Sequence, residues 1–339
     1  MKKTISTLLL LTVTATAASA GQIGHYAGGL MNIRDFFVPE PGFYGVMYNY
    51  YYLTGRLNDP KGHQLGSVNV NPGPGPGAEL SIEPDVGVYM LAPAFIWSTD
   101  YKVLGANFAA FIAPNFANAS VGASVETEES QGIDSDTSQF GLGDWFFQPI
   151  WLGWHLEHYD FSLGYGFYAP TGKYDTDLVT FPNFPNVGPI RVASADNIGL
   201  GFWTNQFQGA AAWYPWVNKA TAVTLALTYE IHSEKEGFDL TPGQDLSLNW
   251  GISQYLPLTK DQKWLVEIGP AGYDQFQVTS DDGQNATNNI LDQVHAAGAQ
   301  LGVTSVEYLA ALNFHYFNEY ESQDRFEGHV FGLSASKKF

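Results

Sequence analysis

The sequence predicts an all-β protein, an antiparallel transmembrane β-barrel of about 12 strands with short periplasmic turns and long extracellular loops. Three observations support this fold class. Apolar residues alternate with small polar ones, long and short connections alternate along the chain, and aromatic residues gather beside the short connections. The composition agrees, because aromatic residues make up 15% of the 339 residues and charged residues only 14%. Disordered chains show the opposite balance.

The chain begins with the features of a secretory signal peptide, which we expect to span residues 1–20. Lys2 and Lys3 precede the apolar run Ile5–Ala18, and Ala18-Ser19-Ala20 is a small-residue cleavage site. No later apolar run approaches the ~18 residues that a membrane helix needs. We therefore expect Sec export, cleavage near Ala20 and insertion into a Gram-negative outer membrane through strands, with a soluble periplasmic protein as the alternative.

Alternation of side chains identifies the strands. In Thr221–His232 the bulky residues, among them Val223 and Leu225, alternate with small or polar ones, and the same period of two occurs in 159–168 and 246–253. The polar face consists mainly of Gly, Ala, Ser, Thr and Asn rather than Lys and Glu. This pattern predicts that the bulky face contacts lipid and that the small face lines a crowded interior.

Twelve segments fit this pattern: 42–54, 84–98, 102–116, 140–155, 159–170, 196–214, 219–232, 244–257, 261–277, 291–302, 306–319 and 326–339. Five connections are tight: Thr99–Tyr101, Leu156–His158, Pro215–Asn218, Leu258–Lys260 and Val303–Ser305. The others, such as 55–83 and 117–139, are mostly long. An even number of strands places both ends of the barrel on the periplasmic side, and the barrel is expected over 42–339.

Aromatic residues near the tight turns predict a girdle at the periplasmic edge of the membrane. They are Trp97, Trp154, Trp213, Trp216, Trp264, Tyr101, Tyr159, Tyr214 and Tyr255. The alternative is a set of core aromatic residues in a soluble fold. Phe339 closes an alternating strand, as in the signal that the barrel-assembly machinery binds. Lipid and lipopolysaccharide are the expected surroundings.

Two groups of residues are candidates for the interior. The strand register points Glu230, Glu267, His232, Asn107, Asn249, Asn313 and His315 inward. They could line a permeation path, or they could form a hydrogen-bond network that fills the barrel. The alternation assigns Tyr48, Tyr50 and Tyr52 to the lipid or girdle face.

The segment 21–41 precedes the first strand and could be a periplasmic tail or a plug inside the lumen. A barrel of about 12 strands encloses more space than side chains fill, which favours the plug. His25, Arg34 and Asp35 are its candidate functional residues. A buried arginine needs an acidic partner, and Glu230 or Glu267 could supply it.

Several function classes find no support. The chain has no cysteine, and 34 Asp and Glu outnumber 15 Lys and Arg, which argues against nucleic acid as a partner. No motif predicts an enzyme, and the spacing of His155, His158, His232 and Asp144 does not assemble a catalytic site. We expect no cofactor and no bound metal.

Eight stretches resemble the bacterial outer-membrane family labelled as a meta-pathway of phenol degradation. They are Gly24-His25-Tyr26, Asn32-Ile33-Arg34-Asp35, Pro39–Tyr44, Tyr48–Tyr52, Arg56-Leu57-Asn58, Tyr273-Asp274-Gln275, Asp292–His295 and the tail from Arg325 to Phe339. The resemblance implies a transporter-like barrel that passes hydrophobic or aromatic small molecules. We expect an outer-membrane channel for passive uptake of such solutes. The alternatives are a non-conducting structural or adhesive barrel and a secreted sugar-binding β-sandwich.

Overall fold

The computed structural model describes residues 24–70, 78–126, 137–179, 190–194, 197–286 and 290–339. Within these residues the chain forms seventeen strands, and no helix there is long and apolar enough to cross a membrane. The expected signal peptide and its cleavage site near Ala20 lie outside the described residues. The loop Asp134-Ser135-Asp136 and the Pro72–Gly77 stretch lie outside them as well.

The strands follow one another along the chain with the following bounds: β1 (Gly42–Thr54), β2 (Ser67–Val70), β3 (Ala78–Val103), β4 (Ala106–Ala113), β5 (Phe116–Glu126), β6 (Thr137–Leu142), β7 (Trp145–His155), β8 (Tyr159–Ala169), β9 (Thr176–Val179), β10 (Ile190–Ala193), β11 (Thr204–Trp213), β12 (Thr221–His232), β13 (Asp245–Pro257), β14 (Trp264–Gln277), β15 (Gln293–Ser305), β16 (Ala310–Gln323) and β17 (His329–Lys338).

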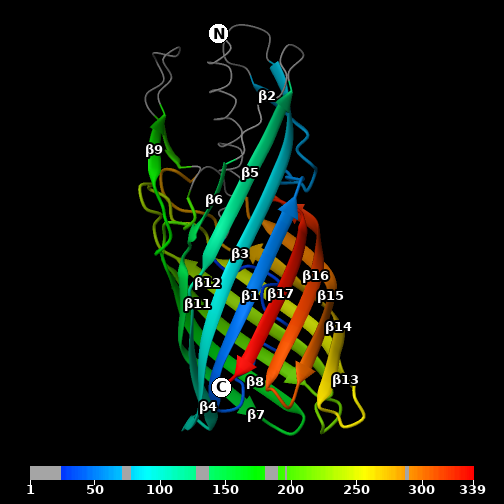
Figure 1. Cartoon of the computed structure of the whole chain (residues 1–339). Coiled ribbons are helices and arrows are strands. Elements are labelled where there is room, and N and C mark those ends of the chain that lie inside the picture. The colour runs from blue at the N-terminus through cyan, green and yellow to red at the C-terminus, as the bar shows by residue number, and fades with distance from the viewer. Residues whose placement is uncertain (1–23, 71–77, 127–136, 180–189, 195–196, 287–289) are drawn as a thin grey trace.

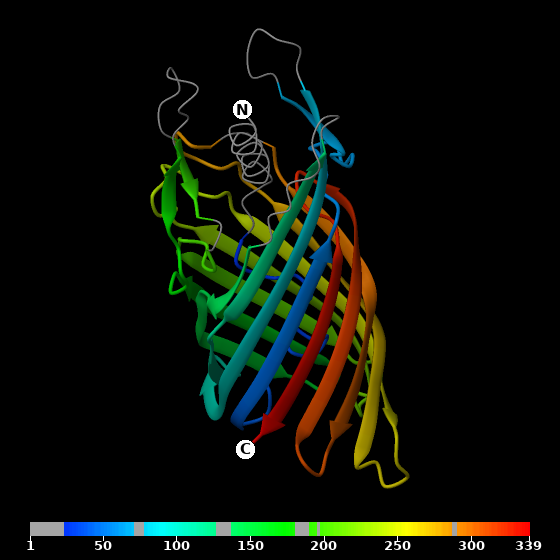
Figure 2. The same cartoon turned by 45° about the horizontal axis from the view of Figure 1, so that its top comes forward.

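The strands close into a barrel because β1 pairs with β17 on one side and with β3 on the other, antiparallel in both cases (Figures 1 and 2). β4 and β5 are two parts of one interrupted barrel strand, and so are β6 and β7. β2 lies off the ring and β9 and β10 form a separate sheet, so the described residues form twelve strands around the barrel. The predicted fold class is therefore confirmed, and closure excludes a β-sandwich.

Side chains on the two faces of the strands differ as the alternation predicts. Leu163, Phe207 and Leu225 lie on the outer face, where about half of each side chain is exposed. The alternating neighbours Ala222 and Ala226 are buried inside. The outer surface is thus apolar around the barrel, and the small residues leave room in the lumen for other parts of the chain.

Long connections gather at one end of the barrel, and tight turns lie at the other end with the C-terminus (Figure 1). The predicted turn at Thr99–Tyr101 is wrong, because β3 continues to Val103 and the chain reverses at Leu104 and Gly105. Both residues have positive φ, 51° and 82°, which is the conformation of a two-residue hairpin turn. The glycine marks this turn in the sequence, whereas the polar Ser-Thr-Asp stretch before it does not.

The predicted loop 117–139 is also wrong at both of its ends. β5 extends to Glu126, paired with β3, and β6 begins at Thr137, paired with β5. Small residues dominate this stretch, so hydrophobic alternation is weak there, and pairing with a long neighbouring strand determines the structure instead. The predicted strand 196–214 is shortened to β11, and the predicted turn at Val303–Ser305 lies a few residues later, after β15.

Gly269 in β14 tests how tightly neighbouring strands approach. A Cβ atom at this position would stand 1.7 Å from the backbone carbonyl oxygen of Ile252 on β13. We expect Gly269→Ala to lower the free energy of unfolding by about 1–3 kcal/mol, because the backbone of β13 or β14 must shift to make room for the methyl group. Thermal unfolding in detergent measures this loss. Gly209→Ala is the matched control, since its Cβ would meet only the Leu163 side chain at 3.5 Å, and equal stability losses in both variants would contradict the argument.

Candidate functional site

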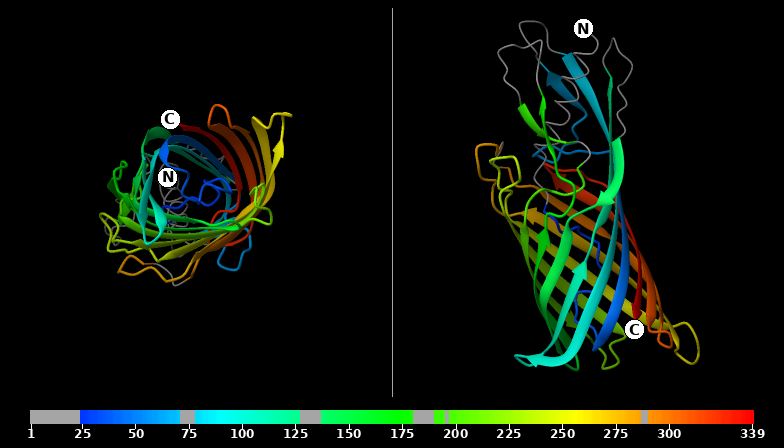
Figure 3. Two further views of the ribbon diagram at one scale, coloured as in Figure 1. Left: turned by 90° about the horizontal axis from the view of Figure 1, so that it is seen from below. Right: turned by 60° about the vertical axis from the view of Figure 1, so that its left-hand side comes forward.

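Residues 24–41 lie inside the barrel, where they form the blue chain enclosed by the strands in Figure 3, left. We call this stretch the luminal segment. It contains no strand, and two tight turns shape it: Leu30 N–H donates to the Ala27 carbonyl at 3.2 Å, and Asp35 N–H donates to the Asn32 carbonyl at 3.1 Å. Its apolar side chains are buried against the strands; they are Tyr26, Ile33, Phe36, Phe37 and Val38.

Barrel side chains satisfy the backbone of the luminal segment. Glu230 accepts from Tyr26 N–H at 3.1 Å, and Gln300 accepts from Ile33 N–H at 2.9 Å. The Ser162 hydroxyl donates to the Phe36 carbonyl at 2.6 Å. An irregular backbone can be buried only with such partners. Polar residues on the inner face therefore hold the segment in a defined position.

Arg34 is the main charged anchor of the luminal segment. Its Nε donates to Glu267 at 2.8 Å and to the Ser253 hydroxyl at 2.9 Å. The Nη atoms donate to the carbonyls of Lys219 and Ala220 at 3.0 and 3.1 Å. The guanidinium also lies 4.4 Å from the centroid of the Tyr255 ring. A planar group with several donors suits this arrangement of acceptors.

Asp35 lies next to Arg34 but faces a different environment. Its Oδ2 accepts from the Tyr48 hydroxyl at 2.8 Å and from Asn32 Nδ2 at 2.6 Å. Burial raises the pKa of Asp35 to about 6, although these hydrogen bonds act in the opposite direction. Asp35 belongs to the luminal segment and not to a strand. Its carboxyl therefore loses this burial when the segment moves, and its charge can change because its pKa then falls toward the ordinary value.

The structure places six of the seven predicted luminal residues in the buried interior: Glu230, Glu267, His232, Asn249, Asn313 and His315. Glu267 contacts Arg34, and Glu230 contacts the backbone at Tyr26. The seventh, Asn107, is half-buried near the tight-turn end. His25 donates or accepts at Thr204 and Asp144 through its two ring nitrogens, at 2.7 and 3.0 Å.

Several aromatic assignments from the sequence are wrong. Tyr48, Tyr50 and Tyr52 point into the lumen rather than toward lipid, and Tyr52 donates to Glu319 at 2.9 Å. Tyr214 and Tyr255 were expected in the girdle but also point inward. A strand in which aromatic and small residues alternate can turn either set of side chains toward the lumen. Only the polar partners inside the barrel determine which set points inward. The girdle residues Trp97, Trp213, Trp216, Trp264, Tyr101 and Tyr159 are exposed on the outside.

Other buried residues of the lumen have no clear signal in the sequence. Tyr214 donates to Asp160 at 2.6 Å, and Lys219 donates to the same carboxylate at 2.7 Å. His155 lies 3.2 Å from Asp160, at the opposite end of β7 from Asp144. The residues considered for an enzyme are thus divided between two places: His155 and His158 contact Asp160 and Tyr214, whereas Asp144 and His232 lie in the contacts around Thr204.

Two cavities border the luminal segment. The first, the apolar cavity, has a volume of about 60 Å³ and is lined mainly by Leu30, Met90, Ala92, Ala94, Phe111 and Phe146. The second, the vestibule, has a volume of about 770 Å³ near the tight-turn end, and Pro39, Lys219 and Asn107 line it. Asp35, Tyr48, Ile96 and Trp151 line both spaces and so form the partition between them.

Three polar atoms at the apolar cavity have no hydrogen-bond partner among the described residues. They are Gln148 Nε2, Trp151 Nε1 and Gln206 Oε1. A buried donor or acceptor without a partner costs about 1–3 kcal/mol. The cavity therefore combines an apolar wall with two donors and one acceptor that a bound molecule could satisfy.

The profile of the family described as "Putative MetA-pathway of phenol degradation" matches residues 55–335. No curated protein matches the chain. The fold is similar to that of the COG4313 outer membrane channel from Pseudomonas putida F1, with a TM-score of 0.56 and 14% identity over 91% of this chain and 100% of that one.

Two further solved structures are similar at lower scores. The β domain of the Bordetella autotransporter BrkA has a TM-score of 0.47 and 10% identity, over 87% of this chain and 99% of that chain. The CymD monoaromatic hydrocarbon channel has a TM-score of 0.40 and 10% identity, over 96% and 97%. At these identities, the first similarity establishes the barrel fold and nothing about the solute.

Proposed function

The chain belongs to the family described as "Putative MetA-pathway of phenol degradation", and from this membership we propose that it is an outer-membrane channel for passive uptake of small hydrophobic or aromatic compounds. The apolar outer face would contact lipid and lipopolysaccharide, and Phe339 would be bound by the barrel-assembly machinery. The tight-turn end would face the periplasm. Sec export and cleavage near Ala20 belong to the same proposal.

The apolar cavity is the observation that carries this proposal. An apolar cavity of about 150 Å³ binds benzene in an engineered protein, whereas this one measures about 60 Å³. An aromatic solute would therefore need the luminal segment to move. Once the partition at Asp35 and Tyr48 opens, the cavity would connect to the vestibule and the periplasm.

The unpartnered polar atoms favour a solute with one polar group on an apolar body. A phenol-type molecule has a ring for the walls formed by Phe111 and Phe146. Its hydroxyl can accept from Gln148 or Trp151 and donate to Gln206. This chemistry agrees with a channel that takes up monoaromatic compounds more readily than sugars or ions. We place no enzymatic step in the lumen.

Uptake of labelled phenol by cells that express the chain tests the proposal. We expect faster uptake than in cells without it, and Ala94→Phe should reduce uptake to the background, because Ala94 is buried and lines the cavity. Leu163→Phe is the matched control, since Leu163 lies on the outer face. Gln148→Leu, which removes one donor and adds little volume, should slow phenol more than toluene.

Two results would contradict the proposal. Equal uptake with and without the chain would favour the non-conducting structural or adhesive barrel. Unchanged uptake in Ala94→Phe, with folding verified by heat-dependent migration on gels, would place the path elsewhere in the barrel.

A further inference from the structure

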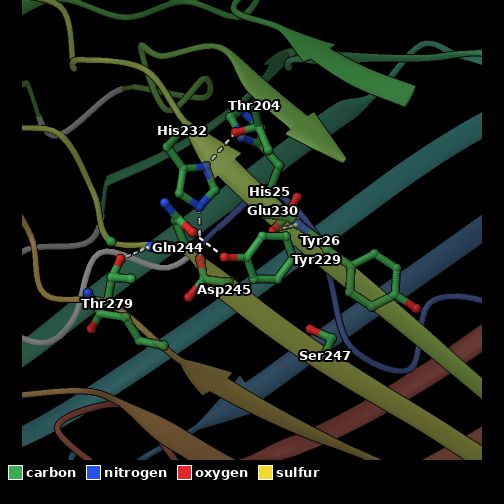
Figure 4. A network of polar contacts seen from close by, with 12 residues as sticks. His25, Tyr26, Thr204, Tyr229, Glu230, His232, Gln244, Asp245, Ser247 and Thr279 are labelled. Atoms are coloured by element: carbon green, nitrogen blue, oxygen red, sulfur yellow. Dashed lines mark hydrogen bonds and ion pairs between the residues drawn. The ribbon is translucent and has the colours of Figure 1, made fainter. Parts of the chain in front are cut away.

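A polar cluster lies where the start of the luminal segment meets β12 and β13. Glu230 and His232 are on β12, and Asp245 opposes Glu230 on β13 (Figure 4). One ligand atom from each of the three lies within 4.8 Å of the others. His232 Nε2 is 3.0 Å from Asp245 Oδ2. Two carboxylates and one imidazole thus converge at a site whose three residues line neither cavity.

His232 also belongs to a series of hydrogen-bond contacts that runs from Asp144 to Asp245, and neutral side chains supply too few hydrogens for all of these contacts. His25 contacts Asp144 and Thr204, and His232 contacts Thr204 and Asp245, so the series contains four short contacts. Each contact needs one hydrogen. Two neutral imidazoles and one hydroxyl supply three in total. A positive species, either an additional proton or a metal ion, must occupy the fourth contact.

The direction of the hydrogen bonds indicates where that species binds. His25 Nε2–H donates to Asp144, which also accepts backbone N–H groups from Gly172 and Leu200 and so acts as an acceptor. With a neutral His25 ring, the Thr204 hydroxyl donates to His25 Nδ1, and His232 Nδ1–H donates to Thr204. This order leaves the lone pair of His232 Nε2 facing Asp245, with no hydrogen between them. A metal-binding histidine is held in the same way, by a hydrogen bond from its other nitrogen.

Glu230 supplies a second, independent observation. Only 2% of its surface is exposed, and its Oε1 atom has no hydrogen-bond partner among the described residues. No Lys or Arg in the described part of the chain forms an ion pair with Glu230 or Asp245. Gly24 passes so close to Glu230 Oε2 and Asp245 Oδ2 that a Cβ atom there would lie 2.2 and 2.6 Å from them. Both carboxylates therefore belong to the cluster without a direct ion pair to Lys or Arg, although Arg325 attracts Asp245 from a greater distance.

We propose that Glu230, His232 and Asp245 form a binding site for a divalent transition metal such as Zn²⁺. One nitrogen and two carboxylate oxygens suit Zn²⁺, whereas Mg²⁺ and Ca²⁺ bind oxygen ligands. Glu230 also accepts from the backbone of Tyr26. The bound ion would hold this end of the luminal segment against β12 and β13, whatever solute the barrel passes.

Isothermal titration of the full mature chain in detergent, treated with chelator and then titrated with Zn²⁺, tests the site. We expect one Zn²⁺ per chain, no competition from Mg²⁺, and affinity at least about 100-fold weaker in His232→Ala and Glu230→Gln. Thr204→Val should weaken binding about 10- to 100-fold, because it frees the histidine ring without removing a ligand. A purely structural role for Thr204 would leave Zn²⁺ affinity unchanged.

His315→Gln is the matched control, because His315 is another buried luminal histidine outside the cluster. It should bind Zn²⁺ like the unchanged chain. Absence of Zn²⁺ binding, or binding that persists in Glu230→Gln and His232→Ala, would overturn the proposal and assign the fourth contact to a proton. Neither result depends on transport, so the site and the channel proposal can fail separately.

Discussion

Replacing Arg34 with alanine should release the luminal segment and raise the conductance of the barrel in planar bilayers. The change leaves Glu267, of which 3% is exposed, without its charged partner. Removing one partner of a buried ion pair costs about 3–5 kcal/mol. If Glu267 regains water in the released state, docking weakens by about a hundredfold to a few thousandfold, since each 1.4 kcal/mol is a factor of ten. Single-channel recording measures the open probability.

Two further variants separate this effect from a general loss of charge. Arg56→Ala removes an ion pair with Glu327 at 2.9 Å that is 43% exposed on the arginine side, and such surface pairs contribute about 0–1 kcal/mol. It should conduct like the unchanged chain. Adding Glu267→Gln to Arg34→Ala should restore part of the docking, because no buried charge then lacks a partner. Low conductance in Arg34→Ala would show that the ion pair does not hold the segment.

The barrel could be predicted because lipid imposes a repeating rule on every strand. Bulky residues such as Leu225 and Leu163 must face out, and the period of two follows from backbone geometry alone. The same rule does not fix where a strand ends: the turn predicted at Thr99–Tyr101 lies at Leu104 and Gly105. A turn there depends on two positive φ angles, while the polar residues just before it continue the strand.

The interior could be predicted only in part. Burial of a charge needs a partner, and this rule alone relates Arg34 to an acidic residue of the lumen. No such rule orients Tyr48 or Tyr214, because a tyrosine fits a lipid interface and a polar lumen equally well. The series of contacts from Asp144 through Thr204 to Asp245 joins five separate parts of the sequence. Spacing along the chain carries no sign of it.

Docking of the luminal segment should weaken as the pH rises from about 4 to 6, because of Asp35. Burial raises the pKa of Asp35 to about 6 in the docked segment, against 3.8 for the solvated carboxyl. The docked state therefore binds a proton that the released state does not. A difference of about two pKa units corresponds to about 3 kcal/mol in favour of docking at low pH. This contribution is fully present below about pH 4 and is lost above pH 6.

The comparison of Asp35→Asn with Glu40→Gln isolates this effect from other titrating groups. An asparagine keeps an acceptor for the Tyr48 hydroxyl but carries no charge, so docking should stay strong at neutral pH and conductance should fall below that of the unchanged chain. Glu40 is on the same segment but exposed, so Glu40→Gln should keep the full pH dependence. If open probability between pH 4 and 7 changes equally in all three chains, the carboxyl that senses pH lies outside the partition, and Asp35 serves only to orient Tyr48 and Asn32.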